Sequence, residues 1–369
     1  MQPCRILQRT YLIVFAWFAV AMCGAWKQGN DLPRASHLTY REKAALGIQR
    51  LQSWYDPATG LYRTTGWWNL ANAITTLADY SLVTGDRQYD NVFPNVLSAA
   101  QNTSAGFLNN FYDDEGWWAL AWIDAYDVTH QQQYLQMAAS IFDDMAKGWD
   151  DRCSGGIWWS KDRKYKNAIA NELFLSVAAH LLTRTANREL RTQYLQWSRR
   201  EWQWFSHTGM INSSHLINDG LDARCANNRQ TEWTYNQGVM LGGLSELYKQ
   251  THDRSLLLQA NAIAAATLSS STLTDAQGIL HDPCEPDCGG DGTQFKGIFV
   301  RNLALLYRVS PSPRYKAFVA ANADSIWQGM QTSDLGIGTK WDAPYGTINA
   351  STQSSGDDVL VSAVSMQAH

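Results

Sequence analysis

The chain has 369 residues, a net charge of −4, and a heavy aromatic load of 17 Trp and 16 Tyr. This length suits one large domain or two ordinary ones, and no linker divides it. The weakly acidic balance gives no reason to expect nucleic acid or an acidic membrane surface as a partner.

The first 25 residues have the pattern of a secretory signal peptide. Two arginines precede a mostly apolar run over residues 11–24, and Cys23-Gly24-Ala25 offers small residues for cleavage. The run is short for a membrane span, with a signal anchor as the alternative. We see no C-terminal lipid-anchor signal. We therefore predict a signal peptide over 1–25, a single domain over 26–369, and a secreted protein that leaves the membrane after cleavage.

Export to an oxidising compartment predicts disulfides among the remaining cysteines. Cys284 and Cys288 are close enough to pair locally, which leaves Cys153 with Cys225. This connectivity is one of three, and a zinc site is the alternative, although no suitably spaced His pair lies nearby. Three sequons would accept glycans in a eukaryotic secretory pathway, at Asn102, Asn212 and Asn349.

Hydrophobic periodicity is helical almost throughout the rest of the chain. The intervening loops are rich in Gly, Asp, Asn and Ser. The expected helices are 38–54, 67–84, 90–102, 114–129, 132–148, 167–184, 188–206, 233–251, 254–270, 295–308, 313–330 and 357–367.

The even-numbered segments differ in composition from the odd-numbered ones. They begin with polar or aromatic residues, as at Trp67-Trp68-Asn69, and continue with small apolar residues. The odd ones carry more charge, as at Arg188-Glu189. A helix that is apolar nearly all round is buried, whereas one with a charged face lies outside. We therefore predict an all-α fold, an (α/α)6 barrel whose inner helices begin around one cleft; an irregular bundle is the alternative.

Two consecutive carboxylates, Asp113 and Asp114, stand at the start of the fourth segment, with Tyr112 before them and tryptophans after them. Helix capping is the competing interpretation, because Asp commonly caps helices and suits the dipole. However, one cap needs one side chain. Adjacent like charges also raise one pKa of the pair, which makes a usable proton donor. Because indole faces suit the C–H faces of sugars, the cluster indicates a glycosidase.

The stretch Tyr112-Asp-Asp-Glu-Gly-Trp-Trp-Ala-Leu-Ala-Trp122 resembles the signature of glycoside hydrolase family 76, the α-1,6-mannanases. The resemblance extends roughly over 40–369 and includes Gly155-Gly-Ile-Trp-Trp159 and Asn171-Glu-Leu-Phe174. It implies a six-hairpin catalytic domain that cleaves α-1,6-mannan from within. Asp113 would be the nucleophile and Asp114 the general acid/base of a retaining reaction, which needs carboxyls about 5–5.5 Å apart.

Further candidates for sugar contacts lie near the starts of the inner helices. Amides and carboxylates suit vicinal hydroxyls, and rings suit pyranose faces, although core packing is at least as strong an expectation for each Trp. The candidates are Trp67, Asn69, Asn72, Tyr112, Trp118, Trp159, Asn171, Glu172, Asp219, Trp233, Tyr235, Asn236, Gln237 and Lys296.

Two other acidic segments have structural interpretations. Asp357-Asp358 would open the last inner helix, where capping is favoured over a sugar contact. Segment 282–292 lacks the ligand spacing of an EF-hand, so a disulfide-stapled rim loop is favoured over calcium. The His residues show no metal-ligand spacing, so we expect no metal and no cofactor.

Other functions remain open. A transglycosidase of cell-wall assembly would use a sugar hydroxyl in place of water, and a mannan-binding protein would lack turnover, although the intact Asp113-Asp114 pair disfavours it. An epimerase would be expected to have a His pair in the cleft, and a uronate enzyme would be expected to prefer acidic sugars. We expect a monomer in a fungal cell-wall setting, whose partner is α-1,6-mannan or a mannooligosaccharide.

Overall fold

The computed structural model describes residues 38–367. The predicted signal peptide over 1–25 lies outside this range and stays a prediction. The helices are α1 (Tyr40–Gln52), α2 (Trp67–Thr84), α3 (Val92–Ala99), α4 (Tyr112–Thr129), α5 (Gln132–Met145), α6 (Ala168–Arg184), α7 (Arg188–Phe205), α8 (Thr234–Thr251), α9 (Arg254–Thr267), α10 (Phe295–Val309), α11 (Pro313–Thr332) and α12 (Ala350–Gln367). Strands β1 (Tyr55–Asp56) and β2 (Leu61–Tyr62) form a short antiparallel pair.

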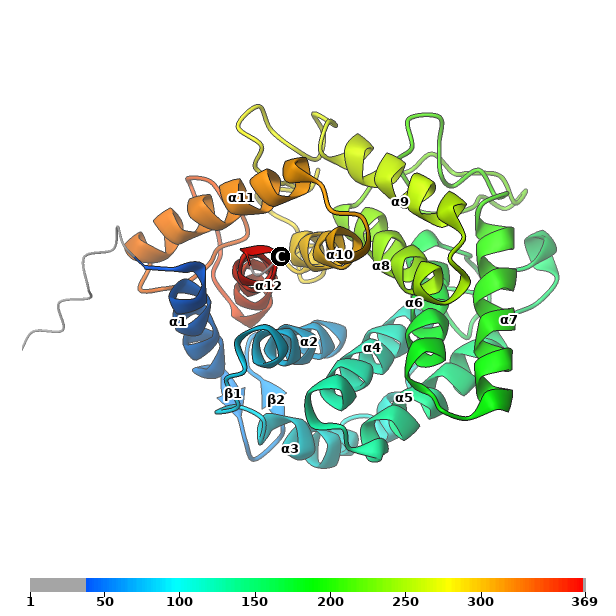
Figure 1. Cartoon of the computed structure of the whole chain (residues 1–369), viewed down its shortest axis with the longest axis horizontal. Coiled ribbons are helices and arrows are strands. Elements are labelled where there is room, and N and C mark those ends of the chain that lie inside the picture. Colours follow the sequence, from blue (N-terminus) through cyan, green and yellow to red (C-terminus); the bar gives the residue numbers. More distant parts are fainter. Residues whose placement is uncertain (1–37, 368–369) are drawn as a thin grey trace, which may run out of the picture. The chain divides into compact units, whose positions relative to one another are not determined.

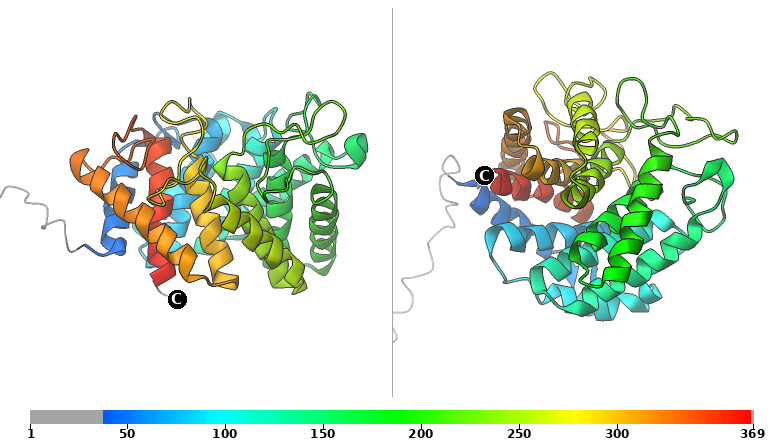
Figure 2. Two further views of the ribbon diagram at one scale, coloured as in Figure 1. Left: turned by 90° about the horizontal axis from the view of Figure 1, so that it is seen from above. Right: turned by 45° about the vertical axis from the view of Figure 1, so that its right-hand side comes forward.

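The even-numbered helices form an inner ring. Each of α2, α4, α6, α8 and α10 packs against the next even-numbered helix, and α12 packs against α2, which closes the ring. The odd-numbered helices lie outside this ring (Figure 1). Seen from the side, the long loops in green and yellow gather at the edge opposite the C-terminus (Figure 2, left). The predicted (α/α)6 barrel is therefore confirmed.

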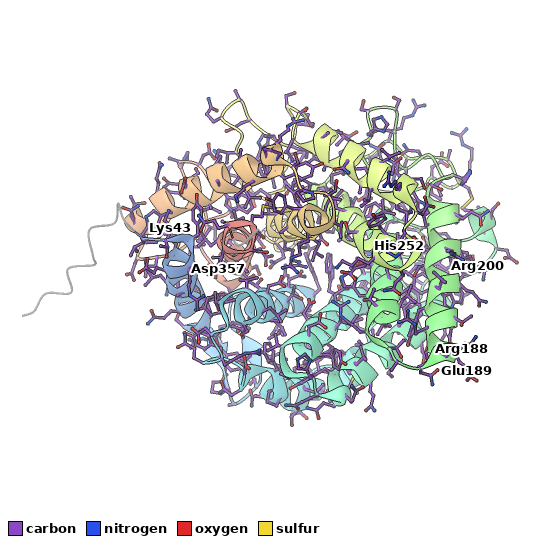
Figure 3. The ribbon with its side chains drawn as sticks, viewed as in Figure 1. Lys43, Arg188, Glu189, Arg200, His252 and Asp357 are labelled. Carbon is purple, nitrogen blue, oxygen red and sulfur yellow. A yellow bond between two sulfur atoms is a disulfide. The ribbon has the colours of Figure 1, made fainter. Side chains whose placement is uncertain are left out.

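Burial separates the two layers as the composition predicted. In α6, every residue from Ala168 to Leu182 is buried. In α7, the buried residues form one stripe that includes Tyr194, Ser198 and Glu201, while Arg188, Glu189 and Arg200 point outward (Figure 3). An amphipathic helix of this kind covers the core with one face only. In the described part of the chain, no helix is both long and apolar enough to cross a membrane.

Small residues let the inner helices approach closely. A Cβ atom at Gly238 of α8 would lie 2.5 Å from the Cα of Phe299 on α10, and one at Gly297 of α10 would lie 2.4 Å from the carbonyl oxygen of Ser355 on α12. Neither contact can be relieved by moving a flexible side chain, since both involve backbone atoms. The glycines at these positions therefore set the spacing of the ring.

The prediction for the last inner helix was wrong at its start. Helix α12 begins at Ala350, so Asp357 and Asp358 lie within the helix and are buried instead of capping it. Asn349 caps it, because its Oδ1 accepts a hydrogen bond from the backbone N–H of Thr352 at 2.9 Å. The polar run that looked like a loop is helical because its side chains bind neighbouring elements; Gln353, for example, accepts from the backbone N–H of Ile337 at 3.0 Å.

Both predicted disulfides are present, Cys153–Cys225 and Cys284–Cys288. Among the predicted sequons, Asn102 is exposed. The side chain of Asn212 donates to Glu232 at 2.6 Å. A glycan at Asn212 would disturb this bond, and one at Asn349 would disturb the cap of α12, so Asn102 is the most accessible acceptor of the three.

Candidate active site

The starts of five inner helices and the loops beside them enclose a cleft of about 390 Å³. Aromatic rings and carboxylates dominate its lining, and no lysine or arginine of the described chain is among the lining residues. They are Trp68, Phe111, Asp113, Asp114, Trp117, Trp159, Tyr165, Asn167, Asp219, Tyr235, Asp291 and Phe295.

Four rings from four different helices pack together along the cleft, and we call them the aromatic floor: Trp68, Trp117, Tyr235 and Phe295. Trp68 stacks on Trp117 with ring centroids 5.5 Å apart, and Tyr235 stacks on Phe295 at 3.9 Å. Trp117 and Tyr235 are also nearly parallel at 6.4 Å. Rings in such an array present flat apolar faces, and ligand sites commonly combine such walls with a few polar groups.

Asp113 and Asp114 lie in the first turn of α4, and neither caps the helix. The residue at the cap position is Phe111, which makes no side-chain cap bond. Asp113 Oδ2 instead accepts a hydrogen bond from Trp159 Nε1 at 2.8 Å. Asp114 Oδ2 accepts one from Asn109 Nδ2 at 2.6 Å. Each carboxylate is therefore oriented by a donor from a loop, which favours a role in the cleft over the capping interpretation.

The third acid of the cluster, Glu115, is structural. Its side chain is fully buried, pairs with Lys161 at 2.7 Å and accepts from the backbone N–H of Asn109 at 3.3 Å. Lys161 also pairs with Asp144 of α5 at 2.7 Å. Glu115 thus holds in place the loop whose Asn109 side chain orients Asp114.

Burial raises the pKa of Asp113 to about 8, and the neighbouring Asp114 charge acts in the same direction. Burial also raises the pKa of Asp114 to about 6; the hydrogen bond from Asn109 opposes this rise and the charge of Asp291 adds to it. The two groups therefore hold one proton between them near neutral pH. A pair that carries one proton can provide a base or nucleophile and an acid at the same time.

We expect Asp113→Asn to raise stability at pH 8. A carboxyl group whose pKa is higher in the folded state than in the unfolded state contributes its full stability to the fold below the unfolded-state pKa. This contribution is lost as the pH rises toward the folded-state pKa of about 8. The gain should be on the order of 2 kcal/mol at pH 8, allowing for solvent in the cleft, and should shrink toward pH 4. Urea unfolding at both pH values measures it, and a less stable variant at pH 8 would contradict the assignment.

The structure brings three of the predicted sugar-contact residues to the cleft, namely Trp159, Asp219 and Tyr235. Tyr165 donates a hydrogen bond to Asp219 and receives one from Asn228 at 2.8 Å. Asp219 thus sits in a fixed orientation in the cleft wall.

The other predicted sugar-contact residues do not line the cleft. Asn171 binds both backbone groups of Ile157, at 2.7 and 3.0 Å, and Gln237 binds both of Ile217, at 2.8 and 3.0 Å. These amides clamp the loops that form the rim. The remaining members support the same region: Trp67 and Trp118 pack on Phe107, Asn72 binds Arg301, Lys296 pairs with Glu285, Trp233 packs on Phe295, Tyr112 covers Gly148, and Asn69, Glu172 and Asn236 are buried.

Several lining residues were not among the predicted contacts; the i, i+4 spacing from Asp113 points to Trp117, but the same spacing relates the packed Trp118 to Asp114. Trp117 lies four positions after Asp113 and so shares its helix face, whereas Trp118 points into the core. Trp68 is likewise the cleft-facing member of its doublet, and Trp67 the packed one. Asp291, in the acidic segment before α10, carried no periodic signal.

The structure is a barrel of six α-helical hairpins, and the starts of its inner helices enclose paired carboxylates among aromatic rings. This arrangement defines a class of sugar-processing barrel enzymes. The model of glycosyl hydrolase family 76 matches residues 39–367, and the chain belongs to this family.

Relatives and solved structures agree with this membership. A mannan endo-1,6-alpha-mannosidase of Eremothecium gossypii is 28% identical over 67% of this chain and 59% of its own length, and one of Candida albicans is 26% identical over 76% and 69%. The chain thus spans less than two thirds of the Eremothecium protein. The structure matches that of an α-1,6-mannanase of Salegentibacter with a TM-score of 0.80 and 26% identity, covering 89% of this chain and 99% of the other.

Proposed function

We propose that this chain is a secreted, retaining glycosidase that hydrolyses α-1,6-mannosidic linkages inside mannan. The observation that carries the proposal is the pair Asp113 and Asp114, held by separate donors in an aromatic cleft of a family 76 barrel. The Salegentibacter enzyme supports it, because its inactive form in complex with α-1,6-mannotetrose has two consecutive aspartates replaced by alanine.

In the first step, ionised Asp113 attacks the anomeric carbon of a mannosyl unit while Asp114 gives its proton to the departing 6-oxygen. The glycosidic bond breaks as the ester bond to Asp113 forms. The N–H of Trp159 holds the attacking carboxylate, and the side chain of Asn109 holds the proton donor. In the second step, Asp114 takes a proton from water, which attacks the ester and releases the sugar with its original configuration.

The mechanism sets a requirement on the shared proton. In the free cleft, burial raises the pKa of both carboxyls, and the pair holds one proton near neutral pH. Attack requires it on Asp114.

The charge of the cleft favours a neutral sugar. Four carboxylates line it, Asp113, Asp114, Asp219 and Asp291, and no lysine or arginine of the described chain does. An acidic sugar would meet like charges with no cation to offset them. This observation favours a mannoside over the acidic substrate of an unsaturated-uronyl hydrolase.

Incubation with linear α-1,6-mannan tests the function. We expect the chains to be shortened to small mannosides, with the Asp113→Asn protein as the inactive control. Lengthened or transferred chains would favour the transglycosidase, in which a sugar hydroxyl takes the place of water. Binding without any change in chain length would favour a mannan-binding protein and refute the enzyme.

A further inference from the structure

Asp291 is a cleft carboxylate that the mechanism above does not use. It lies in the segment that precedes α10, and its Oδ1 accepts a hydrogen bond from Trp68 Nε1 at 2.8 Å. It lines the same cleft as Asp113 and Asp114, and it is exposed. Because only one carboxylate oxygen of Asp291 accepts a hydrogen bond from the aromatic floor, its second oxygen stays free for a ligand.

The segment that carries Asp291 is anchored to α8 and α10 and is stapled internally by a disulfide. Asp282 accepts from the backbone N–H and the hydroxyl of Thr234 at the start of α8, at 2.9 and 2.7 Å. Glu285 pairs with buried Lys296, and Cys284 is bonded to Cys288.

Next to Asp291, Gly292 packs so tightly on this staple that a Cβ atom there would lie 2.6 Å from the Cβ of Cys288. A segment held in this way presents Asp291 in one position. Preorganised polar groups of this kind make effective contacts, since little ordering remains to be done on binding.

Asp291 lies on the Asp114 side of the carboxylate pair. Its negative charge acts on Asp114, whereas the donor that orients Asp113 is Trp159, which comes from the loop before α6. In the proposed mechanism Asp114 protonates the departing oxygen, so groups beside Asp114 face the sugar that leaves. Trp68, which Asp291 holds by its indole N–H, offers a ring face at the same place.

We propose that Asp291 and Trp68 form the leaving-group subsite of the cleft, in which the free carboxylate oxygen of Asp291 accepts hydrogen bonds from the hydroxyls of the departing mannosyl unit while the indole of Trp68 stacks on its ring. This inference rests on the proposed function. It predicts that Asp291 discriminates between leaving groups with hydroxyls and leaving groups without them.

Kinetics on two substrates test the subsite. Asp291→Ala should lower kcat/KM for α-1,6-mannotetraose by about tenfold or more, because hydrogen bonds to a charged acceptor are among the stronger ones. It should leave an α-1,6-mannobioside with a dinitrophenyl leaving group nearly unaffected, since that group has no hydroxyls. Asp287→Ala is the matched control: it makes the same substitution at an exposed position in the same segment. Equal losses on both substrates would overturn the subsite.

A pH profile separates a direct role from a structural one. The titratable groups that line the cleft around Asp114 are Asp113, Asp219, Asp291, Tyr165 and Tyr235. Asp291→Asn keeps an acceptor for Trp68 but removes the charge that raises the pKa of Asp114. The proton donor should then be lost at lower pH, which moves the basic limb of kcat/KM downward. A mere loop defect would lower the rate without moving this limb.

Binding to an inactive background distinguishes failure of this inference from failure of the function. In an Asp113→Asn, Asp114→Asn protein, adding Asp291→Ala should weaken binding of α-1,6-mannotetraose about tenfold, as measured by calorimetry. Unchanged affinity would overturn the subsite while leaving the hydrolase intact. Absence of both binding and turnover in all forms would overturn both.

Discussion

Asp113→Asn and Asp114→Asn should each lower turnover of α-1,6-mannan by about a thousandfold or more. An amide in place of Asp113 cannot attack the anomeric carbon, and an amide in place of Asp114 cannot donate and retake the proton. Both variants should stay folded, because an asparagine still offers an acceptor to Trp159 or to Asn109. Release of reducing ends measures the loss. Asp143→Asn, at an exposed site on α5, is the control that should keep full activity.

Trapping with azide then distinguishes the nucleophile from the general acid/base. With a dinitrophenyl α-1,6-mannobioside, which needs no proton donor, Asp114→Ala should still form the covalent intermediate, and azide should trap it as the α-mannosyl azide. In Asp113→Ala, azide can enter the space of the missing carboxylate and should give the β-mannosyl azide. The opposite pattern would exchange the two assignments. Near-normal turnover by either asparagine variant would remove the pair from the mechanism.

Arg301→Met should cost about 3–5 kcal/mol of unfolding free energy, because it leaves a buried carboxylate without its cation. Arg301 on α10 pairs with Asp358 of α12 at 3.1 Å and also donates to Asn72 of α2. Asp358 in turn accepts from Thr76 of α2 at 2.7 Å. Three inner helices thus meet in one charged network that closes the ring. Urea unfolding at pH 7 measures the cost.

A double variant provides the control. Replacing both members of a buried pair with apolar residues is often nearly neutral, so Arg301→Met with Asp358→Leu should recover much of the loss. A single variant within about 1 kcal/mol of the wild type would contradict the network. So would a double variant no more stable than Arg301→Met alone.

The barrel could be predicted because its two layers have different compositions. Inner helices such as α6 are buried all round, and outer helices such as α7 are charged on one side, so the alternation is visible without any contact being known. The place of Asp113 and Asp114 at the start of an inner helix could be predicted because it is local: both stand in one turn of α4. The disulfides followed from the proximity of Cys284 to Cys288, which left one other pair.

The partners of buried polar side chains could not be predicted. Asn171 and Gln237 have the residue types that bind sugar hydroxyls, but they clamp the backbone of rim loops that are 14 and 20 residues away in the chain. The start of α12 was missed for the same reason, since its Ser, Thr and Gln residues are satisfied by other elements, as in the bond from Gly297 to Ser355. Asp291 reaches the cleft because contacts to Thr234 of α8 and Lys296 of α10 hold its segment in place. Such pairings are set by tertiary structure, which periodicity does not report.

The most direct test of the mechanism is the anomeric form of the first product. Proton NMR during cleavage of linear α-1,6-mannan by the wild-type protein should show the α-anomer appearing first, with the β-anomer following only as the free sugar mutarotates. This result is expected if Asp113 forms a covalent intermediate and Asp114 activates the water. Initial release of the β-anomer would mean a single displacement with inversion and would contradict the account.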